Sequence, residues 1–193
     1  DVLIISELRG GYPDVQIASD VDYAGLIDGD PSPFFLTLPI GKAGVTSENQ
    51  RHYDESWLQE LDRQMATNKA VGLMGHLSKQ DRQHAFPPEA IHWVGTRREG
   101  DTLWGKGYVP PGEARQRIKR YKAQNKKIAT SIDAYAEGVW DDRVKAFRMD
   151  PKTMRLGQID IAPTDRAGMP FLSAVPIPTT EMTQELLDTA KEP

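Results

Sequence analysis

Three polar residues with reactive side chains lie in apolar, strand-like segments of the sequence. His76 ends the apolar run 70–76, Ser131 lies in "IATSIDAYA", and Asp160 lies in "GQIDIAP". A hydroxyl, an imidazole and a carboxylate can supply a nucleophile, its general base and the residue that orients the base. The three residue types therefore allow acyl transfer, but such a triad is defined by geometry in the folded chain and not by spacing.

Alternation along residues 128–136 assigns Ser131 to the open face of its strand, because successive side chains of a strand point to opposite faces. A nucleophile must be reachable, and this position satisfies that need. A serine that simply faces solvent explains the same pattern, and the strand taken alone favours it. No G-x-S-x-G sequence occurs, which disfavours an α/β-hydrolase. The expected core face carries Ile128, Ile132, Ala134 and Ala136, and the open face carries Ser131, Asp133 and Tyr135.

His76 and Asp160 each allow two interpretations. His76 follows Gly75 where an apolar strand gives way to a polar loop, a rigid position that suits a general base. A histidine that only caps the sheet is the simpler explanation of that position. Asp160 lies between Ile159 and Ile161, and an acid in an apolar strand normally has a defined partner because a lone desolvated carboxylate is costly. A solvent-facing aspartate on a half-exposed strand is the alternative.

A metal site is a further alternative, since imidazole and carboxylate groups bind zinc. Its ligands would be His76, Asp81, His84 and His92, whose spacing does not match H-E-x-x-H or another compact ligand set. The chain has no cysteine, which excludes disulfides, thiolate catalysis and cysteine-bound zinc. We therefore expect no metal and no cofactor, and keep a metal-dependent hydrolase that uses His76 and His84 as the weaker hypothesis.

The elements that would position these residues are mixed helices and strands. They predict an α+β domain built on a mostly antiparallel β-sheet or barrel, surrounded by a few helices. The predicted strands are 34–44, 70–76, a hairpin over 91–109 that turns near Glu99 to Asp101, 128–138, and two strands, 143–150 and 155–163, joined at Asp150-Pro151. The predicted helices are 53–68, capped by Asp54, and 112–127, and a segment broken by Gly and Pro covers 164–178.

Length and charge limit the function classes. The 193 residues suffice for one core, with an N-terminal arm over 1–33, a domain over 34–178, and a helix start or linker over 179–193. The first residue is Asp, so we expect a processed product or a trimmed piece of a longer chain. No apolar run is long enough for a membrane span. A net charge of −4 argues against a general nucleic-acid binder.

The predicted helix 112–127 is strongly basic. It is either a solvated face or a surface that docks an acidic protein partner or nucleic acid. Its seven cations are Arg115, Arg117, Lys119, Arg120, Lys122, Lys126 and Lys127.

The order of these segments resembles the bacteriophage prohead proteases, capsid maturation enzymes related to the herpesvirus assemblins. The resemblance runs from Phe34 to Pro178. The segments that carry it are, in order, "FFLTLPIGKAG", "RHYDESWLQEL", "VGLMGH", "PPEAIHWVGTRREGDTLWGKGYV", the charged helix, "IATSI" and "IDIAPTDRAG". Ser131 follows His76 by 55 positions, with a hairpin and a helix between them, as in the family.

The resemblance implies a role for each candidate. Ser131 would be the nucleophile, His76 its general base and Asp160 the residue that orients His76. Assemblins have a second histidine at the third position, whereas phage relatives tend to use an acid, so Asp160 fits the phage version. Assemblins follow this strand with an arginine-rich loop that forms the oxyanion hole. Here Arg166 and Gly168, in "TDRAG", would take that role.

The resemblance also implies an assemblin-like fold and a serine endopeptidase that cleaves scaffold protein, the capsid protein precursor and itself. It would act as a homodimer in the host cytoplasm, inside the viral procapsid, with no membrane or specific nucleic acid as partner. The main alternative is a capsid-internal scaffolding or structural protein that keeps the fold without the activity.

Overall fold

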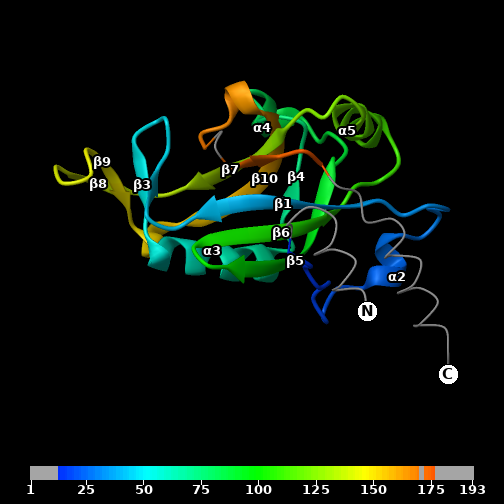
Figure 1. Cartoon of the computed structure of the whole chain (residues 1–193), viewed down its shortest axis with the longest axis horizontal. Coiled ribbons are helices and arrows are strands. Elements are labelled where there is room, and N and C mark those ends of the chain that lie inside the picture. Colours follow the sequence, from blue (N-terminus) through cyan, green and yellow to red (C-terminus); the bar gives the residue numbers. More distant parts are fainter. Residues whose placement is uncertain (1–12, 170–171, 177–193) are drawn as a thin grey trace.

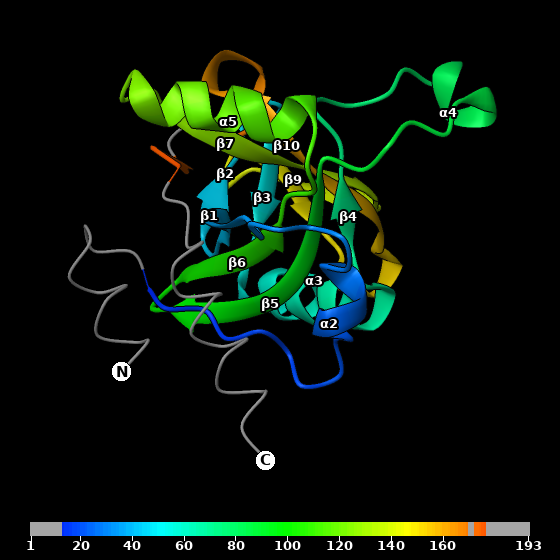
Figure 2. The same cartoon turned by 90° about the vertical axis from the view of Figure 1, so that its right-hand side faces the viewer.

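The computed structural model describes residues 13–169 and 172–176, which form an α+β fold of three mostly antiparallel sheets and a few helices (Figures 1 and 2). The predicted fold class is confirmed. The strands are β1 (Phe35–Lys42), β2 (Val45–Thr46), β3 (Arg51–Tyr53), β4 (Val71–Gly72), β5 (Ile91–Glu99), β6 (Thr102–Tyr108), β7 (Ile128–Tyr135), β8 (Gly138–Asp141), β9 (Ala146–Met149), β10 (Arg155–Pro163) and β11 (Ser173–Ala174). The helices are α2 (Tyr23–Leu26), α3 (Glu55–Asn68), α4 (Asp81–His84) and α5 (Glu113–Ala123), with the short 3₁₀ turns η1 (Pro151–Thr153) and η2 (Thr164–Arg166).

Two of the sheets enclose the main core as a partly closed barrel. Their strand orders are β1-β6-β5-β4 and β10-β7-β11. A parallel bridge between Met74 and Ile161 joins them on one side. On the other side the Thr130 hydroxyl of β7 donates to the carbonyl of Pro39 in β1, over 3.0 Å. The third sheet, β2-β3-β9-β8, extends from one end of this barrel (Figure 1).

Helix α3 begins and packs as its sequence predicts. The Asp54 side chain accepts from the backbone N–H of Trp57 and so caps the first turn. The apolar face buries Trp57, Leu58, Leu61 and Met65 at helical spacing. The helix also buries a glutamine, Gln64, whose amide bonds the carbonyl of Met154 and the N–H of Leu156. These bonds fix the start of β10, the strand that carries Asp160.

Two strand predictions can be compared in detail. Segments 143–150 and 155–163 contain the strands β9 and β10, and the chain turns between them at Asp150-Pro151 as predicted, through η1. Strand β9 pairs with β8 and β3 and not with β10. The predicted strand 70–76 keeps only Val71 and Gly72 as β4. Gly72 lies so close to β10 that an added Cβ would be 1.9 Å from the carbonyl oxygen of Ile159, so only glycine fits there.

The described part of the predicted N-terminal arm packs against the domain. Ala18 donates its N–H to the carbonyl of Val94 in β5, and Asp14 and Val15 are buried. The predicted domain boundary at residue 34 stays a prediction. The predicted helix start or linker over 179–193 lies outside the described residues. No helix in the described ranges is long and apolar enough to cross a membrane.

Helix α5 ends at Ala123, earlier than predicted, and lies over the β7 and β10 strands (Figure 2). Both interpretations of this helix, a solvated face or a docking surface, require exposed cations, and Arg115 is not one of them. That side chain is only 7% exposed and pairs with Asp30 of the N-terminal segment. The guanidinium also donates to the carbonyls of Val109 and Ser32, so its hydrogen-bonding needs are met inside the protein.

Candidate active site

Strand pairing brings two of the predicted site residues together. In the antiparallel β7–β10 pair, Ser131 lies directly opposite Asp160. Side chains directly opposite each other in such a pair project to the same face of the sheet. Ser131 is partly exposed, whereas Asp160 has no exposed surface. The carboxylate therefore lies beneath a serine that solvent can reach.

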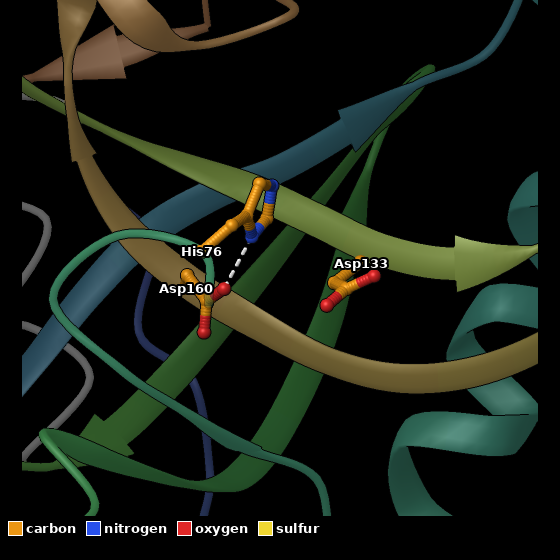
Figure 3. A group of neighbouring side chains, drawn as sticks. All are labelled: His76, Asp133 and Asp160. Carbon is orange, nitrogen blue, oxygen red and sulfur yellow. Dashed lines mark hydrogen bonds and ion pairs between the residues drawn. The ribbon is translucent and has the colours of Figure 1, made fainter. Parts of the chain in front are cut away.

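The third predicted residue, His76, comes from the loop after β4, which the Met74–Ile161 bridge holds against β10. The His76 ring lies between the other two residues. Its Nε2 is 2.8 Å from Ser131 Oγ, and its Nδ1 is hydrogen-bonded to Asp160 Oδ2. Figure 3 shows the ring with one nitrogen directed at the Asp160 carboxylate. The structure thus joins all three predicted residues in one hydrogen-bonded chain.

The Asp160 carboxylate is held by further donors. Its Oδ1 accepts from the Leu73 N–H over 2.7 Å and from the Gln158 amide over 2.9 Å. Both neighbours of Asp160 in β10, Ile159 and Ile161, are also buried, so this strand has no solvent face here. The alternative of a solvent-facing aspartate is wrong. These bonds offset the cost of burying the acid and fix the direction in which it meets His76.

The electrostatics of His76 follow from this arrangement. The hydrogen bond with Asp160 raises the pKa of His76 above its ordinary value of 6.5, although burial acts in the opposite direction. The nearby Asp133 adds a smaller rise in this pKa. An ionised carboxylate can only accept, so Nδ1 carries the hydrogen and Nε2 of the neutral ring is left to accept from Ser131.

Sequence reasoning missed an ion pair beside the site. Asp133 lies two residues from Ser131 on the same face of β7, and its carboxylate pairs with Arg82 of α4, with Nη2 2.6 Å from Oδ2. Figure 3 shows Asp133 next to the His76–Asp160 pair. The period of two along β7 places Asp133 on this face, but no local signal predicts the approach of Arg82 from α4, 51 residues away.

The residues of the alternative metal site do not gather. Within residues 13–169 and 172–176, one group of three possible ligands has its ligand atoms within 4.8 Å of one another: His76, Asp133 and Asp160. His84 is exposed on α4, and His92 on β5 stacks near the ring of Tyr108 instead. Each member of the close group already has a protein partner: Ser131 and Asp160 for His76, and Arg82 for Asp133.

Two cavities meet at Ser131 and His76. A cavity of about 560 Å³ lies on the α5 side and is lined there by Arg117, Ile118 and Tyr121. A cavity of about 420 Å³ lies on the other side, between β7 and the β2–β3 hairpin. Because Ser131 lines both, an extended chain that crosses the serine has room on each side of it.

The predicted oxyanion-hole residues lie at the border of the same site. Arg166 ends the turn η2 and lines both cavities, and Gly168 lines the second one. The carbonyl of Gly168 accepts from the N–H of Glu48 over 2.9 Å, which ties this loop to the residues after β2. Their role as donors to an oxyanion stays a prediction.

Comparisons with known proteins bear on the fold. No family model matches the sequence, and no curated protein matches it. A solved structure does match: the bacteriophage T4 capsid assembly protease, gp21, with a TM-score of 0.50 and 15% sequence identity. The match covers 67% of this chain and 81% of that chain. The chain therefore has the fold of a phage capsid assembly protease, as predicted, while the relation to herpesvirus assemblins stays a prediction.

Proposed function

We propose that this protein is a serine endopeptidase with Ser131 as nucleophile, His76 as general base and Asp160 as the residue that orients His76. The observation that carries the proposal is the continuous hydrogen-bonded chain from Ser131 Oγ through both ring nitrogens of His76 to the buried Asp160. Nucleophile, base and orienting acid in this order are the arrangement by which serine proteases are recognised on unrelated folds.

The reaction would proceed in two acyl-transfer steps. Ser131 Oγ attacks the scissile carbonyl carbon while His76 Nε2 takes the hydroxyl proton. The tetrahedral intermediate then expels the amine, which receives that proton from Nε2, and leaves an acyl-enzyme. Water next attacks the acyl carbon with His76 again as base, which frees the new carboxyl end and restores Ser131. Asp160 stabilises the imidazolium that forms in each step.

The η2 loop would complete the site. Arg166 and the backbone near Gly168 border the space beside Ser131, where the developing oxyanion would lie. Donors aimed at that position usually provide the largest single electrostatic contribution to catalysis. Substitution of Arg166 by Met should therefore lower kcat more than it raises KM.

We propose further that the substrates are scaffold and major capsid protein precursors, together with the protease itself, cleaved as a prohead matures. The proposed location is inside the procapsid in the host cytoplasm, with a homodimer as the active form. The support is the likeness to a capsid assembly protease fold. A cleft open on both sides of Ser131 also suits an extended protein segment.

A fluorophosphonate probe tests the nucleophile without knowledge of the cleavage sequence. Such probes label an activated serine covalently, so intact-mass and peptide analysis should find one adduct, on Ser131. Ser131→Ala should abolish both labelling and peptide cleavage, whereas Ser173→Ala, a half-buried serine on the adjacent strand β11, should keep both. Label on another serine, or undiminished cleavage by Ser131→Ala, would disprove the assignment.

The same preparation separates the alternatives. A scaffolding protein that keeps only the fold would neither be labelled nor cleave. A metal-dependent hydrolase could draw on the close group of His76, Asp133 and Asp160. A chelator would inactivate such an enzyme, whereas the proposed serine mechanism keeps full activity in the chelator.

A further inference from the structure

An exposed pair of aromatic rings lies on the sheet that borders the second cavity. Trp140 of β8 and Phe147 of β9 are each 44% exposed, and their rings meet edge to face with centroids 5.3 Å apart. The indole N–H of Trp140 donates to Asp142, which holds the ring in place. A fixed pair of exposed rings is typical of a surface that binds an apolar group.

The strand register connects this pair to the candidate active site. Phe147 pairs with Arg51 of β3 on one side and with Trp140 of β8 on the other. Paired residues of neighbouring strands project to the same face, so the three side chains form one row across the sheet. Arg51 lines the cavity that contains Ser131. The row, which we call the aromatic face, is therefore continuous with the cleft on the β2–β3 side.

The β8–β9 hairpin carries different side chains on its opposite face. Val139 is 74% exposed and pairs with Arg148, which is itself bound to Asp141 and Asp54. Since adjacent side chains of a strand point to opposite faces, Val139 points away from the row that contains Trp140. The hairpin, which projects from the body in Figure 1, thus has one aromatic face next to the cleft and one charged face away from it.

We propose that the aromatic face is a substrate subsite that binds an apolar side chain of the protein substrate at a distance from the scissile bond. This inference rests on the proposed protease function. Neighbouring strands are about 5 Å apart, so Trp140 lies about 10 Å beyond Arg51, which an extended peptide covers in about three residues. A substrate that leaves the Ser131 cleft on the β2–β3 side passes over Arg51 and reaches the two rings.

The expected consequence is a preference at one substrate position several residues from the cut. Large apolar residues should be enriched there, because they alone bury surface against both rings. Loss of the indole should lower cleavage of such substrates about tenfold, which corresponds to about 1.4 kcal/mol and is in the range found for aromatic anchor residues of interfaces.

A peptide-library digest tests the subsite. A tryptic peptide library from a bacterial proteome is incubated with the wild-type protein and with Trp140→Ala, Phe147→Ala, Trp140→Phe and Val139→Ala, and all cut sites are sequenced by mass spectrometry. The wild type should show an apolar preference at one remote position. Trp140→Ala and Phe147→Ala should lose that preference, and Trp140→Phe should retain most of it.

Val139→Ala is the matched control, because it shortens an exposed side chain of the same hairpin on the opposite face. It should cleave with the wild-type preference. Normal cleavage with identical remote preferences in all five proteins would overturn the subsite and leave the protease assignment intact. A wild-type digest without any cut would instead overturn the protease assignment and the subsite with it. Equal loss of the preference in Val139→Ala would show that the hairpin acts through its fold and not through its aromatic face.

Discussion

Two aspartates in different regions of this protein have buried side chains, and they differ in the basic side chain that each one contacts. Asp160 in β10 is fully buried and bonds His76, and the Asp30 side chain in the N-terminal segment is 2% exposed and bonds Arg115. Burial by itself raises the pKa of Asp30, but the hydrogen bonds from Arg115 and Tyr108 outweigh it and leave that pKa below its ordinary value. Burial and the bond to Asp30 raise the pKa of Tyr108 to about 12.

The two pairs differ in whether the basic partner of the aspartate can change its charge. A guanidinium stays protonated at any ordinary pH, so the Asp30–Arg115 pair is a permanent connection between the N-terminal segment and α5. An imidazole gains and loses a proton near neutrality, and His76 keeps one nitrogen directed at a serine that solvent can reach. A buried acid that faces a fixed cation stabilises the fold, whereas one that faces a histidine can also control a proton.

Among the substitutions that test this comparison, Asp160→Asn should have the largest effect, on the rate of cleavage. An asparagine can occupy the same space but no longer stabilises the imidazolium, and it favours the wrong tautomer of the ring. The same change in the Ser-His-Asp triad of serine proteases lowers kcat by about 10⁴. Cleavage of one substrate at matched enzyme concentration should show a loss of that order in a folded protein.

Asp165→Asn is the comparison for that experiment, since Asp165 lies exposed in η2 beside Arg166 and borders the same site. Its loss should be far smaller. A near-normal Asp160→Asn together with an inactive Asp165→Asn would show that the orienting acid is misassigned.

Arg115→Ala should have the second-largest effect, on stability. It removes one partner of a buried ion pair, which commonly costs about 3–5 kcal/mol because the remaining charge is left buried and unpaired. Arg117→Ala, an exposed neighbour on the same helix, should change the free energy of unfolding by less than about 0.5 kcal/mol. Denaturant titration of both variants measures the contrast, and equal values would contradict a structural role specific to Arg115.

The pH profile of cleavage should report His76. The ring must be neutral to act as a base, so activity should rise with pH through a pKa above 6.5, the direction in which Asp160 shifts it. Asp133 also raises the pKa of His76, by less than Asp160 does, so in Asp133→Asn the rise of activity with pH should occur at lower pH. The opposite sign applies to stability: protonated His76 favours the folded pair, and this contribution is lost as pH rises through the raised pKa. An unchanged profile in Asp133→Asn would contradict the arrangement.

The smallest predicted effect concerns the exposed cations of α5. If they contact an acidic partner or a second copy of the chain, the double variant Arg120→Glu and Lys122→Glu should weaken that association. The difference from the wild type should shrink in high salt, because charges are screened beyond about 8 Å at physiological ionic strength. Analytical ultracentrifugation at low and high salt, alone and with scaffold protein, measures it. Identical association of wild type and variant at low salt would leave α5 as a solvated face.

Local patterns in the sequence predicted much of the fold. Helix α3 with its Asp54 cap, the β5–β6 hairpin and the strands of Ser131 and Asp160 each follow from periodicity and turn residues over short stretches. The errors arose where distant contacts decide the outcome. Strand β9 pairs with β3, from which it is separated along the chain by three helices and five strands, and no local signal predicts that pairing. In the sequence Arg115 is not distinguished from the other six cations of segment 112–127, because its ion pair with Asp30 of the N-terminal segment is a contact between distant parts of the chain.

The sequence by itself determined the residue types of the candidate site and the side of its strand on which Ser131 lies. Alternation put Ser131 on a reachable face, and the apolar neighbours of Asp160 indicated that this acid needs a partner. Only the tertiary structure decided that the partner is His76, since 84 residues separate the two and 55 separate His76 from Ser131. A hydrogen bond forms only when its two heavy atoms are positioned to within a few tenths of an ångström. The β7–β10 register and the close approach of Gly72 to β10 set these positions, and no local pattern encodes either of them.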